Sequence, residues 1–181
     1  MRWDTDAPIP VRYTGSFTLL PQRRTIVPLS LSSSAFANGA EMPARYTCDG
    51  GDVSPPLSWS GVPAAARSLA LIVDDPDAPD PQEPRMIWVH WVLYNLPPDS
   101  AGLAEAAPPP AGAIAGINDF QRTRYGGPCP PVGRHRYFFK LYALDRTLPE
   151  LGHATKAPVE RAMAGHILAE AQLIGTYQRG R

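Results

Sequence analysis

Polar side chains that could bind a ligand or transfer protons interrupt three apolar stretches of this 181-residue chain. Asp75 and Asp77 follow the apolar run LALIV, and His90 stands within the run IWVHWVLYN. His135 and Tyr137 open a third run, HRYFFKLYAL. A carboxylate beside a histidine fixes the tautomer and the orientation of the imidazole ring. If the three stretches are neighbouring strands, these groups converge on one pocket.

Such a pocket suits an oxyanion such as a phosphate, because two oriented imidazoles and backbone N–H groups would surround it. The Gly- and Pro-rich run at residues 125–137, YGGPCPPVGRHRY, favours a stiff loop, since proline fixes φ and glycine permits tight turns. We predict that this loop is the rim of the pocket and that His135 is a donor at its floor. Trp88, Tyr94 and Tyr137 would wall it. The competing interpretation is that both histidines are hydrogen-bonded core residues without a ligand.

Composition favours one ordered, loop-rich domain. Lys plus Arg and Asp plus Glu are 17 each, so the formal net charge is zero; without a basic surplus, a nucleic-acid-binding protein is disfavoured. Proline is 22 of the residues, spread between apolar runs. No run approaches the about 20 apolar residues of a membrane span, and the start MRWDTDAPIP lacks the apolar stretch of a signal peptide. These features predict a soluble, cytoplasmic protein.

The chain is predicted to have an N-terminal extension, residues 1–25, that packs on the outside or adds an edge strand, and a single domain, residues 26–181. Strands are predicted at residues 26–31, 57–59, 69–74, 87–95 and 135–144. Residues 96–135 form a long irregular connection, which in a compact domain is usually functional. A helix is predicted from an N-cap at Thr155 to about Tyr177, from the spacing of Met163, Ile167, Ala171 and Ile174. Strands followed by a helix indicate an antiparallel β core with helical additions.

An ordered set of motifs resembles the signature of the phosphatidylethanolamine-binding proteins, and more closely their bacterial and archaeal Raf-kinase-inhibitor-like branch. The motifs are DDPDAP at 74–79, WVHW at 88–91 and GPCPPVGRHRY at 127–137, with flanking matches over roughly residues 34–178. The resemblance implies a large antiparallel β-sheet packed on a smaller sheet, with a helix near the C-terminus. It also implies a small anion pocket near the sheet edge, formed by Asp75, Asp77, Trp88, His90, Gly127, Pro128, His135 and Tyr137.

Residues and resemblance together favour a non-enzymatic binding or inhibitor protein, without cofactor or metal, for a phosphate- or phosphoethanolamine-like anion. One alternative is inhibition of a serine protease or of a kinase pathway through protein–protein contact. Another is a metal-dependent hydrolase that uses the two histidines and two aspartates. A third is a cysteine hydrolase that uses Cys129 and His135. The physiological ligand, the protein partner and homodimer formation stay open.

Three finer expectations concern geometry and pH. The Ala78–Pro79 bond is predicted to be cis, because X–Pro bonds are the usual site of cis peptides and the DPDAP turn is tight. Cys48 and Cys129 fall in matched motifs and are predicted to lie close together, with free thiols favoured over a disulfide in a reducing cytoplasm. Affinity for a phosphodiester is expected to rise from about pH 8 to about pH 5.5 as His90 and His135 protonate, with a nearby aspartate raising their pKa. Affinity for a monoester would instead pass through a maximum.

Overall fold

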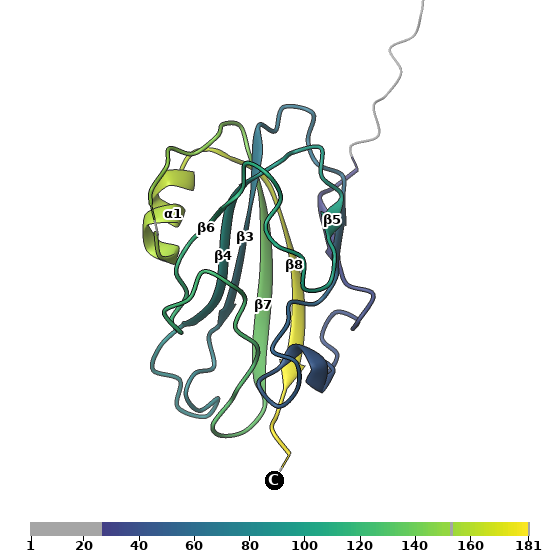
Figure 1. Cartoon of the computed structure of the whole chain (residues 1–181), viewed down its shortest axis with the longest axis vertical. Coiled ribbons are helices and arrows are strands. Elements are labelled where there is room, and N and C mark those ends of the chain that lie inside the picture. The colour runs from purple at the N-terminus through teal and green to yellow at the C-terminus, as the bar shows by residue number, and fades with distance from the viewer. Residues whose placement is uncertain (1–26, 153, 181) are drawn as a thin grey trace, which may run out of the picture.

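The residues that the computed structural model describes, 27–152 and 154–180, form two antiparallel β-sheets that face each other (Figure 1). The larger sheet has the order β6-β4-β3-β7-β8. Its strands are β3 (Ser68–Asp75), β4 (Trp88–Leu96), β6 (Ile114–Ala115), β7 (His135–Leu144) and β8 (Ile167–Tyr177). The smaller sheet consists of β1 (Ser30–Ser32), β2 (Leu57–Ser60) and β5 (Gly102–Leu103). The predicted two-sheet fold is confirmed, whereas the N-terminal extension, residues 1–25, lies outside the described residues.

The predicted strands at 57–59, 69–74, 87–95 and 135–144 are confirmed as β2, β3, β4 and β7, with ends that differ by at most one residue. β3 is buried at every position, as its continuous apolar run predicted, because both faces of the large sheet are covered. One face packs toward the small sheet through residues such as Val73, Phe139 and Trp59. On the other face, Ile72 and Tyr94 belong to the cluster that includes residues of α1 (Lys156–Met163).

The predicted helix to about Tyr177 is wrong beyond Met163. Thr155 is the N-cap residue, but α1 ends at Met163, and Gly165 then adopts φ 79°, a left-handed conformation that glycine adopts without steric cost. The following residues form β8, which pairs antiparallel with β7. Burial in its second half falls on Leu173, Gly175 and Tyr177, which is the two-residue period of a strand.

The long connection between β4 and β7 is less irregular than predicted, since it contains the short strands β5 and β6. The short 3₁₀-helix η1 (Ala44–Tyr46) precedes β2. The Ala78–Pro79 bond is cis, as predicted. In the part of the chain that the structure describes, no helix has the length and apolar character that a membrane span requires.

Candidate functional site

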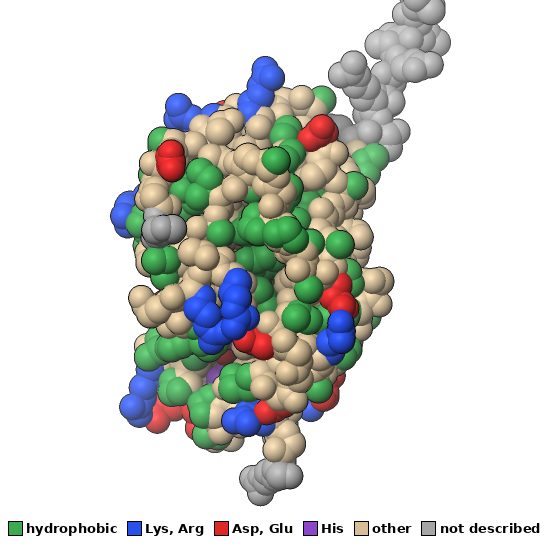
Figure 2. Space-filling model, viewed as in Figure 1, with side chains coloured by type: hydrophobic (Ala, Val, Ile, Leu, Met, Phe, Trp, Pro, Cys, Tyr) green, Lys and Arg blue, Asp and Glu red, His purple; other side chains and the backbone are tan. Residues whose placement is uncertain are grey.

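A cavity of about 360 Å³ lies where β3 ends and its two neighbours, β4 and β7, begin. The antiparallel register causes this placement, because Asp75 at the end of β3 pairs with Trp88 at the start of β4, and Asp74 pairs with Phe138 near the start of β7. Polar groups that are far apart in the sequence therefore meet at one end of the large sheet. In Figure 2, hydrophobic side chains occur over much of the visible face, and a small histidine surface is visible between some of them in the lower part of the molecule.

The cavity collects five of the eight residues predicted for the site: Asp75, Trp88, His90, His135 and Tyr137. The rest of the lining comes from loops: Ala78, Pro79, Met86, Phe120, Cys129, Pro130 and Pro131. Of these residues, the sequence did not single out Met86 and Phe120. Residues 129–131 belong to the Gly- and Pro-rich run, so that run contributes to the wall as expected. Phe120 directly follows GIND at 116–119, one of the flanking matches to the family motifs. Its ring packs edge-to-face against Trp88 and His90, with centroids 5.5 and 5.4 Å apart. That motif was the available signal for Phe120.

Asp77, Gly127 and Pro128 lie outside the lining that the described residues form. The prediction that Tyr94 walls the pocket is wrong, because Tyr94 packs in the cluster beneath α1 on the other face of the sheet. Asp77 instead accepts hydrogen bonds from the Arg136 guanidinium, with Nη2 at 2.7 Å from Oδ1 and Nε at 2.9 Å from Oδ2. The hydrogen bonds from the guanidinium are the largest cause that holds the pKa of Asp77 below its usual range. Asp77 thus positions the turn after β3. Gly127 and Pro128 support the rim through their backbones.

Asp75 and His135 form a buried pair beside the cavity. Nδ1 of His135 lies 2.7 Å from Oδ2 of Asp75, and the other carboxylate oxygen accepts the Asp77 N–H at 2.8 Å. Nε2 of His135 donates to the Val132 carbonyl at 3.0 Å, since a carbonyl oxygen can only accept. Burial raises the pKa of Asp75, and its hydrogen bond with His135 lowers that pKa to a smaller extent. Both ring nitrogens of His135 are engaged by the protein, so donation to a ligand would require one of these bonds to break.

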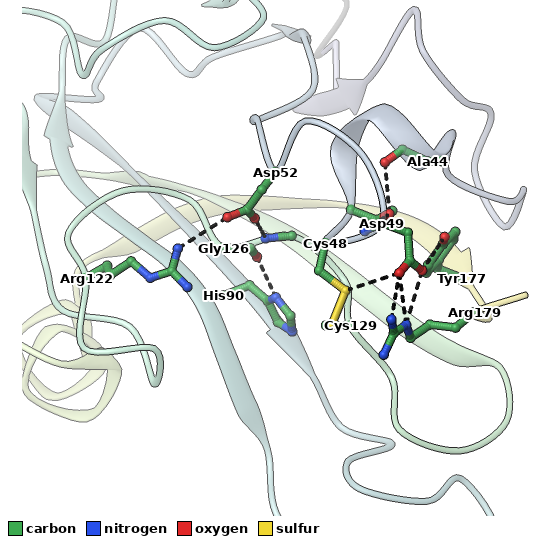
Figure 3. Close-up of a disulfide and its surroundings, with 12 residues drawn as sticks. Ala44, Cys48, Asp49, Asp52, His90, Arg122, Gly126, Cys129, Tyr177 and Arg179 are labelled. Carbon is green, nitrogen blue, oxygen red and sulfur yellow. Dashed lines mark hydrogen bonds and ion pairs between the residues drawn. A yellow bond between two sulfur atoms is a disulfide. The ribbon is translucent and has the colours of Figure 1, made fainter.

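His90 has a different environment, because one of its nitrogens has no partner. Nδ1 lies 2.6 Å from the Gly126 carbonyl oxygen, as Figure 3 shows, so Nδ1 carries the hydrogen. In the neutral ring, Nε2 is then a lone-pair acceptor. Among the described residues, Nε2 of His90 and Oη of Tyr137 are both buried without a hydrogen-bond partner. The Tyr137 ring meets the His90 ring edge-on at 5.1 Å and stacks beside His135 at 6.4 Å, so Tyr137 contacts both histidines.

Burial lowers the pKa of His90 to about 4. Desolvation outweighs the raising effects of the Gly126 hydrogen bond and of the more distant Asp74 and Asp52. His90 is therefore neutral between pH 5.5 and 8 in the ligand-free protein. The expectation that His90 gains a proton in that range, with its pKa raised by a carboxylate, is wrong.

This lowered pKa predicts a loss of stability in acid. A histidine that titrates at about 4 when folded and near 6.5 when unfolded contributes stability that is present above pH 6.5 and is lost as the pH falls toward 4. Between pH 7 and 4.5, wild-type protein should lose about 2–3 kcal/mol more of its free energy of unfolding than His90→Gln, which cannot titrate. Urea denaturation of both proteins at the two pH values measures this difference. Parallel pH dependence in the two proteins would show that His90 is not desolvated as described.

A disulfide between Cys48 and Cys129 holds the rim (Figure 3). The predicted proximity of the two residues is confirmed, with Cα atoms 5.4 Å apart, but the preference for free thiols is wrong. The Cys48 N–H also donates to the Pro128 carbonyl at 3.0 Å. Because Cys129 is in a disulfide, it has no thiolate, and the cysteine-hydrolase alternative fails for this structure.

Two polar side chains tie the rim to the neighbouring loops. Asp52 accepts the Gly127 N–H at 2.6 Å and pairs with both Arg122 and Arg124 at 3.2 Å. Asn118, which is 1% exposed, donates to the carbonyl oxygens of His90 and Arg124 at 2.8 and 2.9 Å. A Cβ on Gly127 would lie 2.6 Å from the Tyr46 carbonyl oxygen, so only glycine allows the rim to approach η1 this closely.

A metal site would require several ligating side chains close together. Within residues 27–152 and 154–180, no group of three or more His, Cys, Asp or Glu side chains is arranged to hold a metal ion. Asp77, one of the residues that the metal-dependent hydrolase alternative requires, is held by Arg136.

Comparison with known proteins agrees with the motif resemblance. The family model described as phosphatidylethanolamine-binding protein matches residues 32–178. A UPF0098 protein of Methanothermobacter thermautotrophicus is 53% identical over 156 residues, which are 84% of this chain and 100% of the relative. A UPF0098 protein of Chlamydia muridarum is 48% identical over 151 residues, which are 83% of this chain and 99% of the relative.

Two solved structures share the fold. The phosphatidylethanolamine-binding protein homolog CT736 of Chlamydia trachomatis has a TM-score of 0.79 and 44% identity, covering 84% of this chain and 99% of that one. YbcL of E. coli has a TM-score of 0.76 and 31% identity, and the match covers 85% of this chain and 100% of YbcL. The match of the family model over most of the chain, together with these relatives, leads to one conclusion: the chain belongs to the phosphatidylethanolamine-binding protein family.

Proposed function

We propose that this protein is a non-enzymatic binding protein that holds a small phosphate- or phosphoethanolamine-type anion in the cavity beside β3, β4 and β7. The observation that carries the proposal is the pair of buried atoms without partners, Nε2 of His90 and Oη of Tyr137. Buried polar groups in native proteins are nearly always hydrogen-bonded. A ligand with polar oxygen atoms would complete both groups at once.

The size and walls of the cavity support a small ligand. Its volume of about 360 Å³ is at the lower end of the range for small-molecule sites, about 300–1,000 Å³. Trp88, Phe120 and the prolines of the rim supply apolar walls, and polar contacts are stronger where water is excluded. The engagement of Cys129 in a disulfide and of Asp77 with Arg136 favours binding over hydrolysis.

Several expectations stay predictions: inhibition of a serine protease or of a kinase pathway, a homodimer, and a cytoplasmic location. The disulfide weighs against the last of these, because the cytosol of most organisms keeps cysteines reduced.

Ligand-free protein should be stabilised by O-phosphoethanolamine, because a molecule that binds only the folded state adds about 2.7 kcal/mol at one hundred times its Kd. Tyr137→Phe should weaken binding about 10- to 100-fold, since hydrogen bonds to charged groups contribute about 1.5–3 kcal/mol. Tyr142→Phe is the matched control, because Tyr142 lies on the same strand five residues away and its side chain is on the opposite face. Thermal unfolding with increasing ligand measures both effects.

Native mass spectrometry of protein purified from its own source complements this test, since a retained ligand is weighed directly. The proposal is wrong if O-phosphoethanolamine and inorganic phosphate leave the unfolding temperature unchanged at millimolar concentration. It is also wrong if both tyrosine variants respond as wild type does.

A further inference from the structure

We infer that the cavity takes its ligand in a protonated form, as an oxyacid with an O–H group beside an acceptor oxygen, and that phosphomonoesters are the class that fits. The inference rests on the proposed function and refines it by naming the ligand class and its protonation state. It follows from which hydrogen-bonding atoms the protein leaves unpaired on the lining residues.

The tautomer of His90 is fixed by backbone groups on both sides. Its Nδ1–H donates to the Gly126 carbonyl, while the Gly126 N–H donates back to the His90 carbonyl at 3.0 Å. Asn118 donates to the same His90 carbonyl. These bonds hold Gly126 against β4, so the ring cannot turn Nδ1 toward the cavity without losing a buried hydrogen bond. The atom left for the ligand is the acceptor Nε2.

Tyr137 supplies the complementary group. Burial raises the pKa of its phenol above the usual value, so Oη keeps its hydrogen and can donate. The ligand must therefore donate to His90 and accept from Tyr137, whose ring centroids are 5.1 Å apart. A monoprotonated phosphate offers both groups on one phosphorus atom. A phosphodiester or a phosphate dianion has acceptor oxygens only, and an acceptor facing the bare lone pair of Nε2 is repelled.

The candidate ligands differ in how much affinity is lost when the proton shared with His90 is taken up. At pH 7, protonating a monoester with a second pKa of about 6 weakens binding about tenfold. For a carboxylic acid with a pKa of about 4.3, taking up the proton at pH 7 would lower the affinity about five hundredfold. A diester could bind only if His90, with a pKa of about 4, took up the proton instead. At pH 7 this protonation would lower the affinity about a thousandfold. The expected preference for monoester over diester is about one hundredfold.

Other titratable groups near the cavity are engaged with each other. Asp75 on β3 and His135 on β7 share a hydrogen bond, and Asp77 beyond β3 is paired with Arg136. Asp74 and Asp52 raise the pKa of His90, and His135 lowers it, each by less than burial does. The proton that accompanies the ligand is therefore expected between His90 and the ligand itself.

Isothermal titration of the full chain with methyl phosphate and dimethyl phosphate tests the inference. Titration at pH 7.5 in two buffers with different ionisation enthalpies gives the number of protons taken up. We expect about one proton per methyl phosphate bound, because the free monoester is mostly a dianion at this pH. Affinity for methyl phosphate should fall about tenfold per unit above pH 7, and dimethyl phosphate should bind about one hundredfold more weakly.

Two variants sharpen the test. His90→Gln should reduce the preference between the two probes, because an amide can turn either a donor or an acceptor toward the ligand. Tyr137→Phe should lose affinity for methyl phosphate while raising the unfolding midpoint of the ligand-free protein, because an unpaired buried hydroxyl is removed. The unfolding midpoint shows that the variant is folded, so the loss of affinity can be interpreted.

Each outcome decides between the inference and the proposed function. Methyl phosphate binding without proton uptake, or equal affinity for both probes, overturns the inference and leaves an anion-binding protein. Failure of both probes at millimolar concentration overturns the proposed function as well.

A third probe, octyl phosphate, distinguishes a lipid-borne monoester from a soluble one. Tighter binding of octyl phosphate than of methyl phosphate supports a lipid source, whose chain would lie near the exposed Met86 and Val132. Equal binding of the two supports a soluble source. Both of these results support the monoester class.

Discussion

Replacing Asp75 with alanine is expected to lower the free energy of unfolding by about 3–5 kcal/mol, because removal of one partner from a buried pair leaves the other unpaired. His135 is fully buried, and its Nδ1 would lose the one hydrogen bond that it makes within the described residues. The Asp77 N–H would lose its acceptor in the same substitution. Urea denaturation at pH 7 measures the loss.

Asp75→Asn is the matched control for that experiment. The amide oxygen can still accept the Asp77 N–H, and the amide nitrogen can donate to Nδ1 of His135. This arrangement suits the tautomer that His135 needs to keep its hydrogen on Nε2 for Val132. We expect Asp75→Asn to cost only about 1 kcal/mol. Equal losses in the alanine and asparagine variants would show that the negative charge, and not the hydrogen-bond pattern, stabilises the pair.

Loss of the disulfide is expected to lower the free energy of unfolding by about 4 kcal/mol, because the bond closes a long loop in the unfolded chain. Cys48 and Cys129 are 81 residues apart in the sequence. The double variant Cys48→Ser/Cys129→Ser and reduced wild-type protein should unfold at the same urea concentration. Ligand affinity should also fall in both, since Cys129 contributes to the cavity wall.

The control for this experiment is a reductant added to the serine double variant, which should have no effect. Wild-type protein with an unchanged unfolding midpoint in reductant would show that the bond does not form or does not constrain the chain. A midpoint that shifts while ligand affinity stays constant would separate stability from binding and show that the other rim contacts hold the cavity.

The sequence predicted the large sheet well because its strands carry strong local signals. The continuous apolar run of β3 and the aromatic run of β4 have few alternative structures in a proline-rich chain. The helix failed at Met163 because Met163, Ile167, Ala171 and Ile174 have helical spacing by chance, while the decisive signal was Gly165. A glycine after a helical segment commonly ends it, and that cue carries more weight than the spacing.

The sequence predicted most of the residues of the site, but not the hydrogen-bond partners that hold them. Asp75, His90, His135 and Tyr137 meet because strand order brings them together, and the motifs identified them. The partners of Asp77 and Gly127 could not be inferred, since Arg136 and Asp52 are 59 and 75 residues away along the chain. The charge state of His90 was mispredicted for a related reason: desolvation depends on the packing of the whole domain, and no local pattern reports it.

The anchoring of the rim by Asp52 and the disulfide bears on how a ligand is recognised. One carboxylate receives hydrogen bonds from residues 122, 124 and 127, and the covalent bond fixes the same segment on its other side. The conformational entropy of these loops is therefore lost when the domain folds and not when the ligand arrives. Complex formation should then resemble rigid docking, with little rearrangement of the backbone. In such a preorganised site, discrimination arises from mismatched hydrogen bonds and shape, because the walls cannot adapt to a wrong molecule.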